Sequence, residues 1–246
     1  DLTRRNWFEK IHYMPIDDDL NYTIIGLLVL EKNGSNFTSV DVANIWLSKL
    51  PILSTCTAER VAYRNVTLQI LPPDSASYHN PYREWIGAQI RADAYGYVNI
   101  GNPERAAEFA WRDARISHSK NGIYGAMFVA AMIASATYCA TLVETINVGL
   151  SEIPKKSRLS EAIRTAINWY ESGLSYQEVV NVIHDQWNEN NMHDWCHTIS
   201  NAVICTVALL YGDDDFGQAI CRAVQTGFDT DCNGATVGSI MGTRLG

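Results

Sequence analysis

The stretch GIYGAMFVAAMIASATYCATLV, residues 122–143, contains no charged side chain and would be apolar on nearly all sides of a helix. Its length is close to that of a membrane span, but Ala, Gly, Ser, Thr and Met dominate it, which favours a helix buried inside a protein. The run 194–211 has the same character. We therefore expect these two segments to be the central core helices, with no helix inserted in a membrane.

Most of the remaining chain also has apolar residues at helical spacing, with recognisable helix starts and stops. Capping signatures occur at Thr38 and Asp41, at Asn102 and Pro103, and at Ser175 and Glu178. The expected helices cover residues 19–32, 42–50, 103–116, 158–173 and 176–187. Residues 55–80 are the least regular part, with a loop at 71–75. The sequence thus predicts an all-α protein.

The composition indicates one large domain over residues 1–246. The chain is 47% hydrophobic and 19% charged, and it has no internal repeat and no hinge rich in Gly, Ser or Pro. The 19 Lys and Arg residues against 27 Asp and Glu leave a formal net charge of -8. Since this field repels polyphosphate backbones, the composition argues against general nucleic-acid binding.

The cysteines show no CxxC pair and no metal-finger spacing, and most of them lie in apolar segments. This pattern is typical of buried thiols in a reducing compartment, so we expect a cytoplasmic protein without disulfides. The six are Cys56, Cys139, Cys196, Cys205, Cys221 and Cys232.

One acidic cluster, Asp17-Asp18-Asp19, lies where the first expected helix begins. One or two acids at a helix start need no special explanation, because aspartate caps helices and favours the positive end of the helix dipole. Three in a row repel one another unless solvent or a cation separates their charges. The run is therefore either a solvated helix start or half of a cation site.

A second acidic turn, GFDTDCNGATVG at residues 227–238, again leads into a helix. Asp229 and Asp231 can converge on one centre there, and their hard oxygens suit Mg²⁺, Mn²⁺ or Ca²⁺. Two such clusters far apart in sequence indicate facing helix ends around a dinuclear site. The run 213–215 is a third group of acids, which we expect to be an exposed loop with a helix cap.

Four motifs, in this order along the chain, resemble those of the ADP-ribosylglycohydrolase family. Residues 17–19 resemble its Thr-Asp-Asp motif, and residues 227–232 with the following Gly/Ala helix resemble its C-terminal metal motif. Between them, residues 87–91 (GAQIR) take the place of its glycine-rich substrate loop, and residues 116–118 (ISH) resemble its Thr-His segment. The resemblance extends over nearly the whole chain.

The resemblance implies a compact orthogonal multi-helical domain that holds two Mg²⁺ ions, with Mn²⁺ as an alternative. Asp17, Asp18 and Asp19 would be ligands on one side, and Asp229 and Asp231 on the other. The ions would hold the ribose hydroxyls and polarise the attacking water, which is chemically sensible because paired cations orient a diol and lower the pKa of bound water.

The resemblance also implies a set of substrate-binding residues, which are Gly87, Gln89, Arg91, His118 and Tyr124. Gly87 would let the loop backbone approach the diphosphate, and Tyr124 would offer a ring to the base. Structural alternatives remain open: Arg91 could pair with a neighbouring acid, His118 could be a satisfied histidine at a helix end, and Tyr124 could belong to the core. His197 is expected to be a satisfied core histidine.

The implied activity is metal-dependent hydrolysis of an ADP-ribosyl glycosidic bond to a protein side chain or a small molecule, with the acceptor and the catalytic residue unassigned. The chain departs from the family pattern in lacking a counterpart of the N-terminal helix that carries a catalytic acid, and its C-terminus also looks cut. Cys232 stands where the family commonly has a hydroxyl ligand, and a thiol is a poor ligand for Mg²⁺.

These departures keep a second hypothesis open, a catalytically silent ADP-ribose-binding or structural protein on the same fold. A third, an all-helical prenyl-diphosphate enzyme, would need acids spaced as DDxxD, and neither cluster has that spacing. The oligomeric state is not predicted.

Overall fold

The two apolar runs form the centre of the molecule as helices α7 (Asn121–Ser135) and α12 (Thr198–Leu210). The structure is a computed structural model that describes residue 12 and residues 17–246. Every residue of α12 is buried, and so are most residues of α7. Helices without a polar face have thus been placed inside the protein, as their composition predicted.

All other regular elements of the described chain are helices, and its one β-type pairing is an isolated bridge between Trp85 and His197. The all-α prediction is therefore confirmed. The α-helices are α1 (Asp18–Asn33), α2 (Ser39–Lys49), α3 (Thr57–Thr67), α4 (Asp74–Ser77), α5 (Asp93–Tyr97), α6 (Pro103–Ala114), α8 (Leu142–Ser151), α9 (Arg158–Glu171), α10 (Tyr176–Gln186), α11 (Met192–Trp195), α13 (Phe216–Gln225) and α14 (Thr230–Leu245). Short 3-10 helices are η3 (Gly34–Asn36), η4 (Ile52–Ser54) and η5 (Ile86–Arg91).

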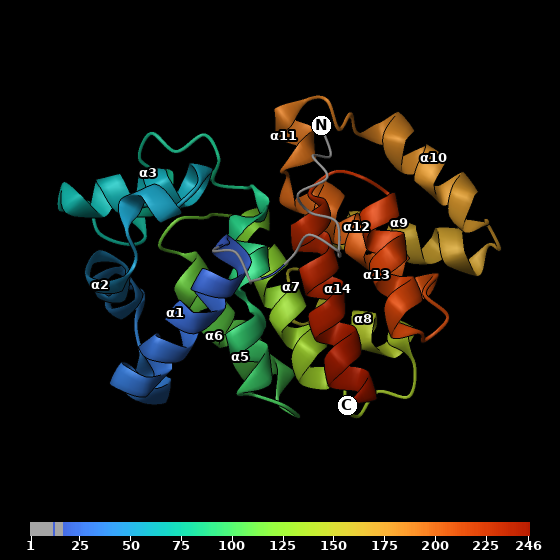
Figure 1. Cartoon of the computed structure of the whole chain (residues 1–246), viewed down its shortest axis with the longest axis horizontal. Helices are drawn as coiled ribbons and strands as arrows, with labels where there is room; N and C mark the ends of the chain where they lie inside the picture. Colours follow the sequence, from blue (N-terminus) through green and yellow to red (C-terminus); the bar gives the residue numbers. More distant parts are fainter. Residues whose placement is uncertain (1–11, 13–16) are drawn as a thin grey trace.

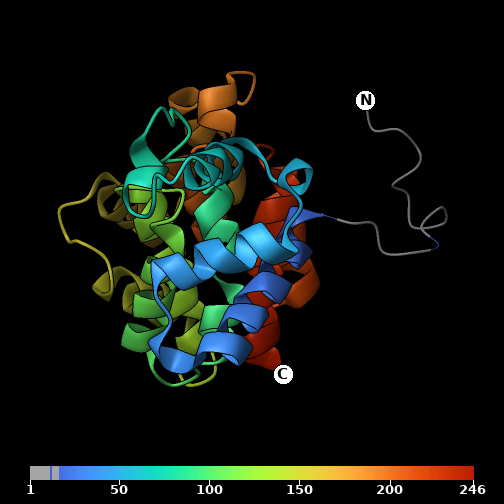
Figure 2. The same ribbon diagram turned by 90° about the vertical axis from the view of Figure 1, so that its left-hand side faces the viewer.

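The helices form two flanks around a central group (Figure 1). Helices α1, α2 and α3 lie on one side, α9, α10, α11 and α13 lie on the other, and α5, α6, α7, α12 and α14 lie between them. In the view turned by 90°, α1 and α2 run side by side in front of the central helices (Figure 2). The main hydrophobic cluster contains residues from Tyr22 in α1 to Met241 in α14, so both flanks share one core.

The predicted helix caps at Thr38, Asn102 and Ser175 are present, and each of these side chains accepts a backbone N–H of the first turn. Gly34 and Gly173 follow α1 and α9 with φ of +65° and +80°, where a residue without Cβ is favoured. These helix ends could be predicted because the residues that form each cap are close together in the sequence.

The prediction of one helix across residues 122–143 was wrong beyond Ser135. Helix α7 ends there, and α8 begins at Leu142 after the cap residue Thr141. The Thr141 hydroxyl accepts the N–H of Glu144 at 3.1 Å, while Glu144 Oε2 accepts the N–H of Ala140 at 2.7 Å. This reciprocal pair starts a new helix within the apolar run.

The second apolar run also starts later than expected. His197 is the cap residue of α12 rather than an interior residue, and its Nδ1 accepts the N–H of Ile199 at 3.1 Å. It is buried and hydrogen-bonded, as expected of a satisfied histidine. Residues 192–195 instead form the separate short helix α11.

Two further expectations were wrong in part. Residues 57–67, placed in the least regular segment, form the amphipathic helix α3. Cys56 and Cys221 are exposed, although the other four cysteines are buried and all six are free. None of the helices in the described part of the chain is long and apolar enough to cross a membrane.

Candidate active site

The start of α1 presents the first acidic cluster. Asp17 is the cap residue, and its side chain accepts the N–H of Leu20 at 2.9 Å. Asp18 and Asp19 occupy the first helical turn. Because the N-terminus of a helix carries partial positive charge, it tolerates carboxylates, and one oxygen of Asp17 is engaged in the cap.

The second cluster lies on a turn that the buried core holds in place. Gly227 and Phe228 have φ of +88° and +63°, and they wrap around Glu189, whose Oε2 accepts the Phe228 N–H at 3.3 Å. Glycine is favoured at position 227 because a side chain would be strained at φ of +88°. The N–H of Asp229 then donates to Asn201 Oδ1 of α12 at 3.3 Å.

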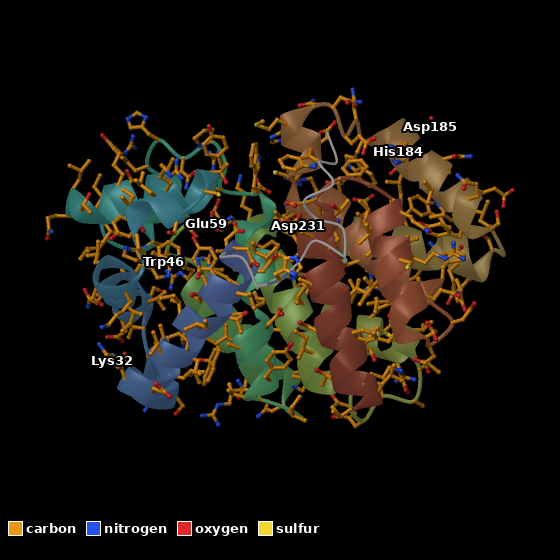
Figure 3. The ribbon with its side chains drawn as sticks, in the orientation of Figure 1. Lys32, Trp46, Glu59, His184, Asp185 and Asp231 are labelled. Carbon is orange, nitrogen blue, oxygen red and sulfur yellow. The ribbon has the colours of Figure 1, made fainter. Side chains whose placement is uncertain are left out.

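The two helix starts meet at one pocket of about 410 Å³. Asp18 reaches it from α1, and Asp229 and Asp231 reach it from α14. Figure 3 shows Glu59, on α3, and Asp231, on the central helix α14, near the middle of the molecule. The other lining residues are Cys56, Thr57, Glu59, Trp85, Ile86, Gly87, Ile90, Met192, Trp195, Cys196 and Cys232.

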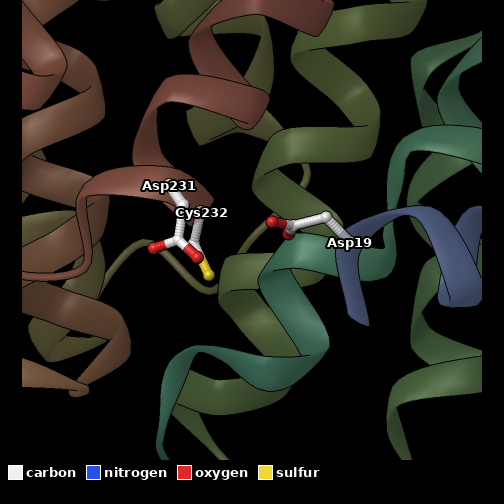
Figure 4. Close-up of side chains that lie close together, drawn as sticks. All are labelled: Asp19, Asp231 and Cys232. Atoms are coloured by element: carbon white, nitrogen blue, oxygen red, sulfur yellow. The ribbon is translucent and has the colours of Figure 1, made fainter. Parts of the chain in front are cut away.

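Asp19 lies slightly apart from the open pocket but close to the same acids. One carboxylate oxygen each of Asp19 and Asp231 and the sulfur of Cys232 lie within 4.8 Å of one another (Figure 4). Asp19 Oδ1 is buried and has no hydrogen-bond partner among the described residues. A buried acceptor without a donor is costly unless something else approaches it, and a cation would do so.

The electrostatics of the cluster are those of crowded acids that pair with no basic side chain among residues 17–246. Burial, followed by repulsion from Asp18 and Asp231, raises the pKa of Asp19 to about 8. Burial and then Asp231 raise the pKa of Asp229 to about 7. Burial is also the main reason why the pKa of Asp18 is raised. No salt bridge in the described part of the chain involves any of these four acids.

Replacing Asp19 with Asn is expected to raise the melting temperature of the metal-free protein at about pH 8. A carboxyl group whose folded-state pKa lies above its unfolded value of 3.8 destabilises the fold increasingly as the pH rises from that value to the folded one, about 8. The gain over wild type should therefore shrink as the pH is lowered toward about 4. Thermal melts in EDTA measure this difference in melting temperature. In a chain of this size, a change of 1 kcal/mol in the free energy of unfolding shifts the melting temperature by roughly 2–4 °C.

The control for this experiment is Asp185→Asn, which changes an exposed acid on α10 far from the cluster (Figure 3). It should melt like wild type at every pH. A gain for Asp19→Asn that is absent, or equal at high and low pH, would contradict the buried, mutually repelling cluster.

The acidic run 213–215 is placed as expected, in a loop with a cap. Asp215 accepts the N–H of Gln218 at 2.7 Å and caps α13. Asp214 pairs with Arg244 at 2.6 Å beside another hollow of about 470 Å³. Its charge is thus already balanced.

Among the predicted substrate residues, Gly87 lines the pocket and Gln89 does not. A Cβ on Gly87 would lie 2.0 Å from Glu59 Oε1, so the glycine makes room for this buried acid. Gln89 is fully buried, and neither its Nε2 nor its Oε1 has a hydrogen-bond partner among the described residues. Its amide oxygen lies against Gly125, behind the pocket wall.

Arg91 is also behind the wall, where it pairs with acids. Its guanidinium is 2.7 Å from Glu59 Oε1 and hydrogen-bonds Asp113 as well. His118 is buried beside it, with Nδ1 2.8 Å from Ser117 Oγ, and burial followed by the charge of Arg91 lowers its pKa well below the usual value. Tyr124 is partly buried against the core and does not line the pocket.

The pocket residues that the sequence did not single out are Glu59 and a set of apolar side chains, which we call the apolar wall. The apolar wall consists of Trp85, Ile86, Ile90, Met192 and Trp195. Glu59 is 2% exposed, and burial, opposed by Arg91, raises its pKa to about 7. A detectable signal was present, because Glu59 shares a helix face with Ala62 and Val66, and an acid on an apolar face calls for a partner. Trp85, Trp195 and their apolar neighbours come from separate segments, and nothing in their spacing marks them.

These features define the class of protein: an all-helical fold in which two distant helix starts bring carboxylates to a pocket that is also lined by apolar side chains.

Comparison with known families identifies it further. The model of the ADP-ribosylglycohydrolase family matches residues 5–246, and the chain belongs to this family, which acts by hydrolysis on ADP-ribose linkages. A search among curated proteins found no significant match.

Proposed function

We propose that this protein hydrolyses an ADP-ribosyl glycosidic bond to a protein side chain or small molecule in a metal-dependent reaction at the acidic pocket. The observation that carries the proposal is the meeting of Asp18, Asp19, Asp229 and Asp231 at the starts of α1 and α14, without a basic partner in the described part of the chain. Family membership supplies the reaction type.

The donor set fits divalent cations. Carboxylate oxygens are the ligands that Mg²⁺ and Mn²⁺ prefer, and a cation would offset the repulsion that raises the pKa of Asp19 and Asp229. When bound, a pair of such ions would orient the ribose diol and lower the pKa of the attacking water. We propose two Mg²⁺ ions, held by Asp18 and Asp19 from α1 and by Asp229 and Asp231 from α14, with Asp17 closing the set through the oxygen that the helix cap leaves free.

Glu59 is the residue best placed to hold or move a proton. It lines the same pocket as the acids and has a pKa of about 7, which suits general acid–base work near neutral pH. Arg91 and His118 lie behind it, so we propose that they position Glu59 rather than contact the substrate. Gly87 would face the ligand directly.

The apolar wall would hold the base and exclude water. Trp85 and Trp195 line the pocket, and an aromatic ring is a suitable platform for a planar base. Trp85 is fixed, because its Nε1 donates to His193 Nδ1 at 3.2 Å. We propose that the adenosine part of the substrate lies along this wall, with its distal ribose at the carboxylates.

Calorimetry with ADP-ribose tests the proposal. With Mg²⁺ present, ADP-ribose is expected to bind, and EDTA should weaken the binding because the diol loses its anchor. Incubation of an ADP-ribosylated protein or small molecule with the full chain and Mg²⁺ should release ADP-ribose. Equal affinity in Mg²⁺ and EDTA would count against metal-held ribose. Binding without turnover would instead support the alternative, a catalytically silent ADP-ribose-binding protein.

A further inference from the structure

One thiol belongs to the acidic cluster itself. Cys232 follows Asp231 in the first turn of α14, and its sulfur is within 4.8 Å of carboxylate oxygens of both Asp19 and Asp231 (Figure 4). Two ligand atoms bound at roughly 2.0–2.3 Å to one tetrahedral Zn²⁺ ion are roughly 3.3–3.5 Å apart. Side-chain movements of roughly 1 Å would therefore let a single ion contact all three.

This thiol differs from a purely structural one. Cys205 is also buried, but its sulfur lies 3.4 Å from Asn233 Oδ1 and is accounted for as a hydrogen-bond donor in the core. Cys232 is 5% exposed and lines the pocket, next to the unpartnered Oδ1 of Asp19. Asp93 is more than nine-tenths buried, also has an unpartnered Oδ1, and is close enough to Asp19 to raise its pKa. Three carboxyl groups, those of Asp229, Asp19 and Asp231, thus lie close enough to Cys232 to act on its thiol.

The chemistry of the three ligands selects a kind of cation. Mg²⁺ binds oxygen and discriminates against sulfur, whereas Zn²⁺ and Cd²⁺ accept a thiolate together with carboxylates. Burial, followed by the nearby Asp229, raises the pKa of the Cys232 thiol, so the thiol would lose its proton only as a thiophilic cation binds, because coordination deprotonates a thiol. A site of two carboxylates and one thiol is therefore better matched to a thiophilic ion than to Mg²⁺.

We propose that Asp19, Asp231 and Cys232 form a binding position for a thiophilic divalent cation of the Zn²⁺ class, which would take the place of one of the two Mg²⁺ ions at the Cys232 side and leave Mg²⁺ at the Asp18 and Asp229 side. The inference rests on the proposed function, because it concerns the same acidic cluster. It assigns Cys232 as the ligand that determines which metal is bound.

Cadmium is the probe, since a cysteine thiolate bound to Cd²⁺ produces an ultraviolet charge-transfer band. Titration of the full chain with Cd²⁺ in the absence of Mg²⁺ should give a saturating band that Cys232→Ser lacks. The serine keeps the size of the side chain and offers oxygen in place of sulfur. Zn²⁺ should displace Cd²⁺ from wild type, and its affinity should fall at least about tenfold in Cys232→Ser, while Mg²⁺ should compete poorly with both ions.

The matched controls are Cys56→Ser and Cys196→Ser, because these cysteines line the same pocket without belonging to the three-ligand group. Both should keep the band. A band that survives in Cys232→Ser, that disappears in either control instead, or that never forms in wild type would overturn the proposal. Circular dichroism of each variant separates loss of a ligand from loss of the fold.

These results are separable from the proposed reaction. A band that depends on Cys232 in a protein that does not release ADP-ribose would support the cation position and reject the hydrolase. Mg²⁺-dependent release of ADP-ribose without any Cys232-dependent band would reject the cation position alone.

Discussion

Hydrolysis of the ADP-ribosyl bond is expected to fall by on the order of 10³-fold or more when Asp231 is replaced with Asn, with the fold intact. Asp231 is exposed in the first turn of α14, lines the pocket, and adds to the raised pKa of both Asp19 and Asp229. Asparagine keeps the shape and removes the charge that would hold a cation. In the proposed mechanism both the anchoring of the diol and the activation of water would depend on that cation, and each would be worth several kcal/mol of barrier.

The measurement is release of ADP-ribose in saturating Mg²⁺, with a thermal melt of each protein. The melting temperature should stay the same or rise, because one of several repelling charges is gone. Asp74→Asn is the matched control, since Asp74 is likewise an exposed acid in the first turn of a helix, α4, and lies outside the pocket. Undiminished turnover by the Asp231 variant would refute the two-cation mechanism.

The largest loss of stability is expected from Arg91→Ala, at about 3–5 kcal/mol. The guanidinium pairs with Glu59 and Asp113, donates to Ser117 Oγ at 2.8 Å, and lies 5.1 Å from the ring centroid of Trp46. All of these groups are buried, and all except the Trp46 ring are polar. Removing the cation therefore leaves two acids, Glu59 and Asp113, in the interior without their arginine partner.

Urea denaturation measures this loss, with Arg164→Ala as the control. Arg164 is exposed on α9, and its removal should change the free energy of unfolding by no more than about 0.5 kcal/mol. Because the cost arises from unpaired acids, adding Glu59→Gln and Asp113→Asn to the Arg91 variant should restore part of the stability. A loss below about 1 kcal/mol for Arg91→Ala would show that the buried pairs are not formed as described.

The helices were predictable where their signals are local. Thr38 with Asp41 and Ser175 with Glu178 are capping boxes whose members are three residues apart, and both form. The same logic applies to Thr141 and Glu144, which start α8, but the uncharged run around them concealed the break. Apolar character shows that a segment is buried, and it does not show where one helix stops and the next begins.

The candidate site was predictable only in part, because its parts come from distant segments. Asp18 and Asp231 could be identified as helix-start acids, yet their meeting depends on how some 200 intervening residues fold. The sequence left open whether Arg91 binds substrate or pairs with an acid, because the two acids that bind it, Glu59 and Asp113, are 32 and 22 residues away. A buried charge can be assigned a role only when its partners are known.

The hydrogen bond from the Asp229 N–H to Asn201 determines what binding at this pocket would cost in conformational entropy. Asn201 belongs to the most deeply buried helix, so the turn that carries Asp229 is already ordered when a ligand arrives. Ordering a free backbone costs about 1–2 kcal/mol for each residue. The turn that carries Asp229 is already ordered in the folded protein, so ligand binding does not include this cost. The affinity of the carboxylates for their ligand is then determined by charge and shape complementarity, because binding requires little further ordering of the chain.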